Sequence, residues 1–351
     1  MKNFITKSLF LLVVTMLIAS ATGFTAFAVG GAIGAASLFP RPKGVAMMAL
    51  DVEIWKPWIL DTLFKDNQFL NFARNADEYV LMGKVVHIPN AGSASGTSRN
   101  RTSLPATVTQ RTDVDVTYAL DEFTTDPRLI SHAEKILSYD KMSSAMGQDM
   151  GAITELVAEW VLYAWAPGAT ESTSYVRTTG ANATAHVTGA TGNRKVVVLA
   201  DIKSLMTKFN KWNIPKNDRY LMLDSDMYQQ LTDAMDATAY KDFSQYFDAK
   251  TGVVGKLYGF QIIERSTVLS YTNAATPVLR LPGAADLTTA NGAGLAWQKD
   301  YIERAIGTTN IFEDLNNPTY YGDIYSLLVN AGGRFIENGG KGVAALIQTT
   351  P

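Results

Sequence analysis

A long polar stretch between two predicted strands constrains the fold of this chain most. Residues 79–88 (Tyr-Val-Leu-Met-Gly-Lys-Val-Val-His-Ile) are rich in β-branched residues and predict a strand that ends at Pro89. Residues 107–118 alternate valine and tyrosine with polar residues and predict a second strand, and residues 90–101 between them contain no large apolar side chain. The segment therefore predicts an extended β-hairpin. Because an isolated two-stranded hairpin is at best marginally stable, we expect something outside the subunit to hold it.

A long amphipathic helix follows the hairpin. From Tyr139 to Ala164 apolar side chains recur every three or four residues, and Pro167-Gly168 closes the pattern. At about 1.5 Å per residue such a helix is on the order of 35–40 Å long, so it can form the structural axis of a domain. We expect Leu156 and Trp160 to pack this helix against the sheet of its domain.

An aromatic segment precedes the hairpin. Within residues 49–78, the spacing of Trp55, Trp58 and Phe64 indicates one face of a helix. A short segment cannot bury this stripe by itself, so it docks either on its own subunit or on a neighbouring copy, and ordinary core packing explains it at least as well. For assembly contacts we predict these three aromatic residues together with Asn90, Arg99 and Arg101 of the hairpin.

The second half of the chain changes character twice. Residues 168–194 are rich in Gly, Ala and Thr and predict a loop. Helical and strand patterns then alternate, with a helix over Asp201–Trp212, a strand over Tyr220–Leu223 and a helix capped at Asp224, which predicts a compact α/β unit. The last 60 or so residues consist of short β segments separated by Gly and Asn, for which antiparallel pairing is expected.

The amino-terminal residues 1–47 leave two interpretations open. Lys2 and Lys7 precede an apolar run, and Ala26-Phe27-Ala28 offers small residues for cleavage, which is typical of a secretory signal peptide. Alternatively, the functional start lies at Met47 or Met48, where the composition changes abruptly. In both cases these residues are set apart from the fold.

Composition and motifs argue against an enzyme. The chain has no cysteine, which excludes disulfides, thiolate zinc sites and cysteine nucleophiles, and its net charge of −2 argues against sequence-specific nucleic-acid binding. His87, His132 and His186 lack the spacing of a metal site. No hydrolase elbow, phosphate-binding loop or dinucleotide fingerprint occurs, and the pair Asp224 and Asp226 is best explained as a helix cap. We therefore expect no catalytic, cofactor or metal site, and no small-molecule substrate.

The order of these elements resembles the HK97-fold major capsid proteins of tailed double-stranded DNA bacteriophages. Local similarity to this family is found in Lys256-Leu-Tyr-Gly-Phe-Gln-Ile-Ile263, Gly294-Leu-Ala-Trp-Gln-Lys-Asp-Tyr301, Tyr321-Gly-Asp-Ile-Tyr-Ser326, Gly332-Gly-Arg-Phe335 and Lys341-Gly-Val343. The resemblance implies an α+β fold divided into an N-arm (48–78), an extended hairpin called the E-loop (79–127), a P domain with a long spine helix (128–198), an α/β A domain (199–290) and returning P-domain strands (291–351).

The family also implies the function. Many copies, arranged as hexamers and pentamers, would tile an icosahedral capsid around packaged DNA, with non-specific DNA contact on the inner face and with scaffold, portal and decoration proteins as further partners. The particle would assemble in the host cytoplasm. Some members of the family cross-link their shells covalently through a lysine in the E-loop. Residues 89–110 of this chain contain no lysine, so we expect a non-covalent shell. Two alternatives are an encapsulin-type compartment shell and an exported surface-layer or adhesin-like binding protein.

Overall fold

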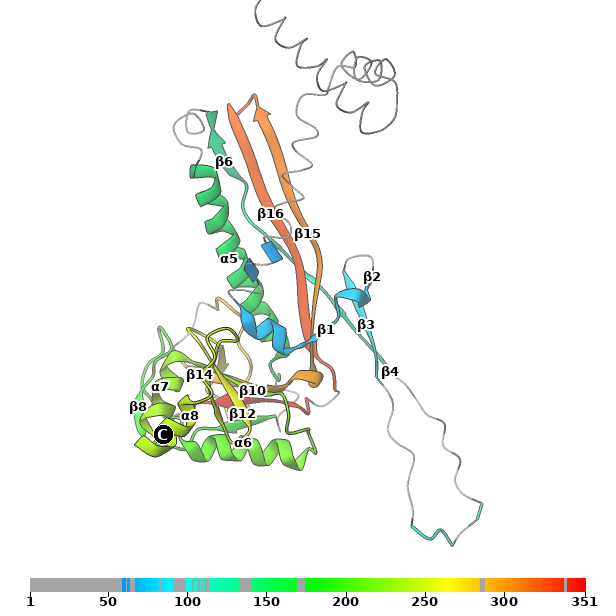
Figure 1. The fold of residues 1–351 in the computed structure, drawn as a ribbon, viewed down its shortest axis with the longest axis vertical. Helices are drawn as coiled ribbons and strands as arrows, with labels where there is room; N and C mark the ends of the chain where they lie inside the picture. Colours follow the sequence, from blue (N-terminus) through cyan, green and yellow to red (C-terminus); the bar gives the residue numbers. More distant parts are fainter. Residues whose placement is uncertain are drawn as a thin grey trace, which may run out of the picture. The chain divides into compact units, whose positions relative to one another are not determined.

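The computed structural model describes most of the chain from residue 59 onward (Figure 1). The described residues are 59–60, 62–63, 67–81, 84–90, 99–102, 104–105, 108, 110, 114–132, 140–168, 174–284, 288–337 and 340–351. All of them belong to the unit Lys56–Pro351. The predictions for residues 1–47, Trp55, Trp58 and Phe64, and for the side chain of Asn90, lie outside the described part.

A seven-stranded mixed sheet organises the second half of the described chain. Its strands run in the order β11 (Val253–Leu257), β12 (Phe260–Arg265), β10 (Arg219–Asp224), β14 (Ala290–Gln298), β17 (Val343–Ile347) and β7 (Tyr175–Arg177), and β13 (Leu269–Thr272) also pairs with β14. Within residues 291–351, which we expected to be returning P-domain strands, β14 and β17 lie inside this sheet, and each of their residues is buried. Residues 302–335 belong to the second sheet, described below.

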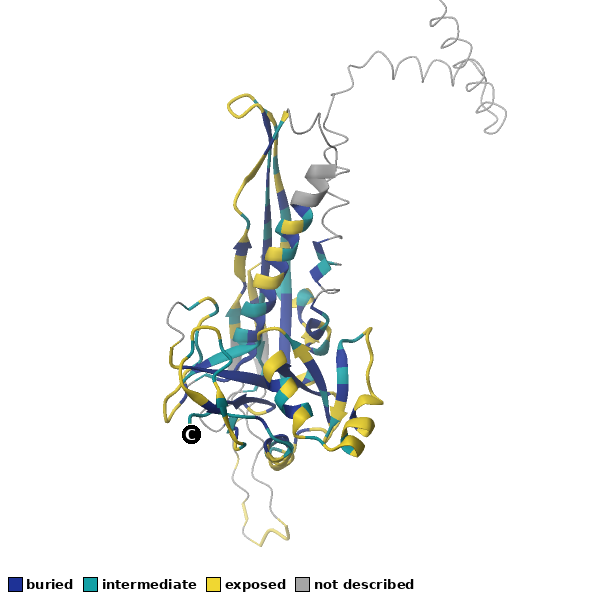
Figure 2. Ribbon diagram, turned by 90° about the vertical axis from the view of Figure 1, so that its left-hand side faces the viewer, coloured by how far each residue is buried: buried dark blue, intermediate teal, exposed yellow. Residues whose placement is uncertain are grey.

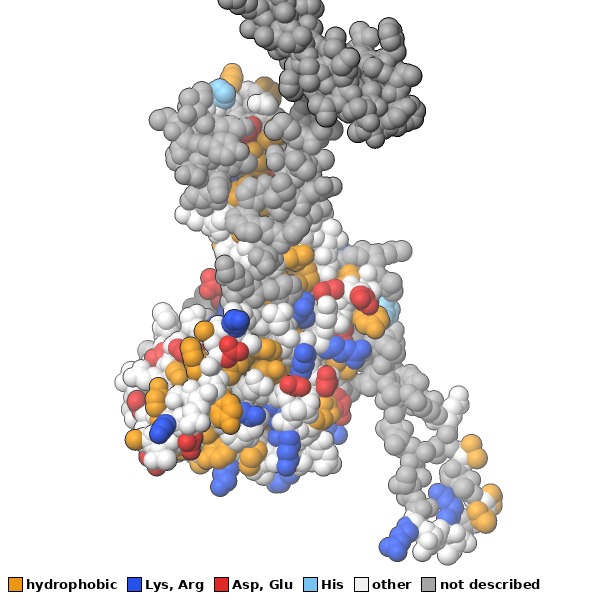
Figure 3. All heavy atoms as spheres, viewed as in Figure 1, with side chains coloured by type: hydrophobic (Ala, Val, Ile, Leu, Met, Phe, Trp, Pro, Cys, Tyr) orange, Lys and Arg blue, Asp and Glu red, His pale blue; other side chains and the backbone are white. Residues whose placement is uncertain are grey.

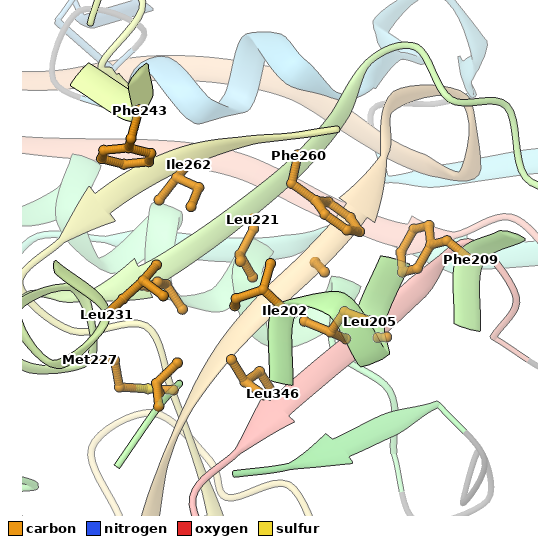
Figure 4. Packing of buried hydrophobic residues seen from close by; sticks show 14 of the residues in the cluster. Ile202, Leu205, Phe209, Leu221, Met227, Leu231, Phe243, Phe260, Ile262 and Leu346 are labelled. Atoms are coloured by element: carbon orange, nitrogen blue, oxygen red, sulfur yellow. The ribbon is translucent and has the colours of Figure 1, made fainter. Parts of the chain in front are cut away.

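Three helices cover one face of this sheet. They are α6 (Leu199–Lys211), α7 (Ser225–Asp233) and α8 (Ala237–Ser244). Figure 4 shows their apolar side chains packed against the strands, with contributions from Ile202, Leu205, Phe209, Met227, Leu231 and Phe243 of the helices and Leu221, Phe260, Ile262 and Leu346 of the sheet. The predicted α/β alternation is thus confirmed, and so is the helix cap, since the backbone N–H of Met227 donates to Asp224 Oδ1 over 2.6 Å.

A second sheet is built on a long hairpin of β15 (Ile302–Asn317) and β16 (Gly322–Phe335). Its strand order is β1 (Arg74–Asn75), β15, β16 and β5 (Asp121–Thr124), with β6 (Arg128–Ser131) also paired to β16. Antiparallel pairing was expected here, but not strands of 16 and 14 residues. Irregularities between Ile306 and Thr309 and between Asp314 and Asn317 interrupt the register of the two strands. The sequence pattern therefore suggests several short strands where the structure has one long hairpin.

The spine helix α5 (Asp140–Trp165) runs beside β16, as predicted from residues 139–164 (Figure 1). Buried residues lie on the side of α5 that faces the sheet, and exposed residues lie on its other side (Figure 2). The side chains that pack against the body of the protein are Met146, Met150, Ile153, Val157, Val161, Leu162 and Trp165. None of the helices in the described part is both long and apolar enough to cross a membrane.

The placement of Leu156 on this packing face is corrected by the structure, because its side chain is 41% exposed. Trp160 is half-buried, contacts Tyr163 on its own helix, and lines a small cavity together with Phe123 of β5 and Gly332 of β16, so it lies beside the sheet. Successive residues of an α-helix are rotated by about 100°, so Leu156 points well away from Val157, which is buried. The periodic pattern identified the helix correctly, but Val157 and not Leu156 belongs to its buried face.

Three short strands form the base of the predicted hairpin. β2 (Val80–Leu81) and β4 (Val114–Ala119) flank β3 (Val85–Asn90), and β3 and β4 pair from Val85 opposite Ala119 to Asn90 opposite Val114. The predicted hairpin is therefore confirmed.

Residues 168–194 were expected to be a loop, but β7, β8 (Asn182–Thr184) and the start of β9 (Asn193–Lys195) lie within them. The backbone groups of these short strands are paired, since β8 pairs with β9 and β7 pairs with β17.

Candidate functional site

The described residues at the tip of the β3–β4 hairpin are exposed. Arg99 and Arg101 face solvent, and the apolar side chains of Leu104 and Val108 are 81% and 95% exposed. Both apolar side chains are therefore available for contact with another surface. These residues, with Asn90 at the start of the tip, form what we call the E-loop tip.

The root of the same hairpin is firmly anchored. Val86 is buried with Leu120 and Ala305, and the Tyr118 hydroxyl donates to Glu303 Oε1 over 3.4 Å. Glu303 is 2% exposed, and burial raises the pKa of its carboxyl. Burial, reinforced by the Glu303 carboxylate, also raises the pKa of the Tyr118 hydroxyl, so this group keeps its proton and remains a donor. The hairpin is thus held at one end and leaves the described tip residues without core packing.

A groove lies between the spine helix and the segment that joins β5 to β6. It has a volume of about 560 Å³, and Leu156 of α5 and Leu129 of β6, which is 43% exposed, both line it. An ion pair of 2.6 Å between Arg128 and Asp149 lies at the same groove. We call this feature the spine groove. The exposure of Leu156, which conflicts with its predicted packing role, is what gives the groove an apolar wall.

The described part of the aromatic segment packs on its own subunit. Phe69, in the 3₁₀ helix η1 (Gln68–Phe72), is 4% exposed and meets the Trp165 ring edge-on at 5.9 Å. Phe72 stacks on Tyr220, and its carbonyl accepts a hydrogen bond from Trp297 Nε1. Ordinary core packing therefore explains this end of the segment.

A buried histidine–aspartate pair was missed by the sequence analysis. His186 Nε2 lies 2.8 Å from Asp224 Oδ2, and both side chains are about nine-tenths buried. Burial opposes the charge on the ring, but the hydrogen bond and the negative charge of Asp224 outweigh it and raise the pKa of His186 above 6.5. A possible signal was Gly292, where a Cβ would lie 2.7 Å from His186 Nε2. Only a glycine on β14 leaves room for the ring.

This pair has the geometry of a structural link. His186 Nδ1 has no hydrogen-bond partner within the described residues, so no hydroxyl group is aligned there as a nucleophile. The pair borders a pocket of about 310 Å³ whose charged side chains, Glu159, Asp226 and Arg280, are of mixed sign. The described part of the chain contains no group of three or more acidic or histidine side chains that could hold a metal ion. The geometry connects the 185–192 loop to the start of α7.

Several solved structures are similar to this chain. A chain from Mycobacterium phage Che8 aligns with a TM-score of 0.52 at 15% identity over 79% of this chain and 90% of that one. The capsid of Ralstonia phage GP4 aligns with a TM-score of 0.56 at 10% identity, covering 80% and 87%. The capsid of an empty GTA particle gives 0.53 at 11% identity, covering 81% and 90%.

The chain has the HK97-type capsid fold. This confirms the α+β fold expected from the order of its elements, and the likeness extends over about four fifths of the chain. No protein-family model matches the sequence, and no curated protein sequence matches it. At identities of 10–15% the likeness lies in the arrangement of the backbone.

Proposed function

We propose that this chain is a structural subunit that self-assembles into the icosahedral capsid shell enclosing the double-stranded DNA of a tailed phage. The observation that carries the proposal is the HK97-type capsid fold over about 80% of the chain, at TM-scores of 0.51 to 0.56 with capsid structures of phages P-SCSP1u and GP4 and of a GTA particle. The protein acts as a building block, located in the virion after assembly in the host cytoplasm, and it carries out no catalysis.

The E-loop tip supports self-association as the mode of assembly. Its exposed apolar pair, Leu104 and Val108, gains stability only when another surface covers it. We propose that this surface belongs to a second copy of the chain and that Asn90, Arg99 and Arg101 contribute to the contact.

Charge complementarity favours the spine groove as the acceptor of the tip. Residues 90–111 contain three arginines and no acidic residue. The groove beside the spine helix is lined by two acidic residues, Asp126 and Asp149, of which Asp149 is paired with Arg128. It also offers apolar contact at Leu129 and Leu156. Opposite charges around an apolar centre are the usual composition of a specific protein–protein interface. Since residues 89–110 contain no lysine, this contact is non-covalent.

Electron microscopy of the expressed full-length protein tests the proposed function. We expect closed icosahedral shells built from hexamers and pentamers, together with scaffold, portal or decoration proteins when these are co-expressed. Particles that contain packaged protein instead of nucleic acid would identify an encapsulin-type compartment. A soluble monomer found outside cells, with its first residue after Ala28, would support the exported binding protein and refute the proposal.

Deletion of residues 90–101 tests the role of the E-loop tip. The deleted subunit should keep its helical circular-dichroism signal and its melting temperature, because its root is anchored at Val86 and Tyr118, but it should not form particles. A pair of double substitutions tests the charge of the tip without shortening the hairpin. Arg99→Gln/Arg101→Gln should weaken assembly, whereas the control Lys241→Gln/Lys250→Gln removes the same amount of charge elsewhere and should leave assembly unchanged. Normal particles from the deletion variant would refute the contact.

A further inference from the structure

Helix α6 differs in charge from the other labelled α-helices of the described chain. The spine helix α5 has four acidic residues and one lysine, α7 has two aspartates, and α8 has one residue of each sign. Helix α6 has three lysines and a single acid, Asp201. Asp201 is 1% exposed and accepts hydrogen bonds from Thr179 Oγ1 and from the backbone N–H of Val198. The surface of α6 is therefore positive.

The lysines lie on the side of α6 that faces solvent. The opposite side, formed by Ile202, Leu205 and Phe209, is fully buried in the core of the sheet. Lys203 and Lys211 are exposed, and their separation of eight positions corresponds to about 12 Å along the helix axis. The exposed Lys216 follows the helix, and Asp218 is the one exposed acid in this segment. In Figure 3, Lys and Arg side chains gather along the lower side of the globular part, where Figure 1 places α6.

Interactions within the subunit do not account for this group of lysines. Lys208 donates to the carbonyl oxygen of Tyr175 over 2.7 Å and lies 5.7 Å from the centre of the Trp212 ring, so it has a structural role. Lys208 and Lys211 are in the last turn, where a positive charge complements the helix dipole. Lys203 lies before that turn and Lys216 lies beyond the helix, so the dipole does not explain them.

The chemistry of this surface suits a polyanion better than a small ligand. Ser204 and Thr207, on the same side, donate their hydroxyl hydrogens to the carbonyls of Ala200 and Lys203 and thus offer no directed donor to a ligand. What remains is a row of lysine ammonium groups beside an open groove of about 570 Å³. Point charges on flexible stems bind phosphates without a fixed geometry.

We propose that Lys203, Lys211 and Lys216, here called the α6 basic face, contact the phosphate backbone of the enclosed double-stranded DNA without sequence preference. The proposal rests on the proposed capsid function and names the surface of the subunit that meets the DNA. Duplex DNA carries one negative charge per about 1.7 Å of its axis when both strands are counted, so phosphates are available along the whole length of a 12 Å row of lysines. Contacts to the phosphate backbone require no side chains that read the bases.

A salt titration of DNA binding tests the proposal on the full-length subunit. The probe is a fluorescently labelled 30-base-pair duplex of random sequence, and its affinity is measured by anisotropy at several salt concentrations. The variant Lys203→Gln/Lys211→Gln/Lys216→Gln should bind more weakly, and the slope of log affinity against log salt should become smaller by about 2 to 3, since each lost phosphate contact contributes about 0.9. The control Lys241→Gln/Lys250→Gln/Lys256→Gln removes three exposed lysines from α8, β11 and the loop between them, and should keep the wild-type slope.

Each outcome decides the proposal separately from the capsid function. An unchanged slope in the α6 variant, or equal changes in the two variants, overturns the α6 basic face as the DNA surface. A polyglutamate peptide serves as a second probe. If the α6 variant loses binding to this peptide but binds DNA as the wild type does, the proposed DNA contact is overturned and an acidic protein partner is indicated. Whether the wild-type chain forms shells is observed by electron microscopy in the same preparations, so failure to assemble refutes the capsid proposal without being confused with the DNA result.

Discussion

Replacing Phe69 by alanine distinguishes core packing from intersubunit contact in the aromatic segment. The Phe69 side chain is 4% exposed and lies edge-on against Trp165, which is fully buried. Truncation removes this buried ring and leaves a cavity beside Trp165, which for a phenylalanine costs about 3–5 kcal/mol of unfolding free energy. The edge-to-face pair accounts for roughly 0.5–1.5 kcal/mol of that loss. Because both rings belong to one subunit, the whole effect should be present before any assembly.

The assay is urea unfolding of the unassembled subunit, followed by tryptophan fluorescence and circular dichroism. We expect Phe69→Ala to lower the midpoint by on the order of 1 M, given a typical slope of about 1–3 kcal/mol per M. The matched variant Leu156→Ala truncates an apolar side chain that is 41% exposed, and it should change the unfolding free energy by less than about 1 kcal/mol while weakening assembly. Equal stability of wild type and Phe69→Ala, combined with loss of particles, would refute the assignment of Phe69 to the core.

Two further predictions concern local features of the fold. The pKa of His186 is raised above 6.5, so its pairing with Asp224 stabilises the folded state fully below pH 6.5 and loses this contribution as the pH rises through the folded-state pKa. The variant His186→Gln should therefore remove this pH dependence from melting curves recorded between pH 6 and 9. Melting curves of the variant that are identical to those of the wild type would contradict the prediction. At Gly333 a Cβ would lie 2.6 Å from Trp165 Nε1, so Gly333→Ala should destabilise the subunit by about 1–3 kcal/mol. At Gly151, in α5, a Cβ would meet no neighbour within 4 Å, so Gly151→Ala should stabilise the subunit by about 0.5–1 kcal/mol. Melting temperatures that shift in the same direction in both variants would contradict this pair of predictions.

Features that depend on neighbours in the sequence were predicted well. The spine helix, expected over residues 139–164, spans Asp140–Trp165, and the helix expected over residues 201–212 spans Leu199–Lys211. The cap at Asp224 and the pairing of the β3–β4 hairpin also agree with prediction. Helical periodicity, capping and turn-bounded strands all arise from contacts within a few residues, so the sequence alone carries them.

The tertiary structure alone decided which surfaces meet. Nothing local places β14 and β17 in the middle of the sheet, since their partners lie tens of residues away or more. The exposure of Leu156, and hence the spine groove, depends on which side of α5 the β15–β16 hairpin covers. His186 meets Asp224 only because Gly292 on a third segment leaves room for the ring. Periodicity shows that a helix or strand has an apolar side, but the partner that covers it is chosen by packing between distant segments, where shape and volume must match.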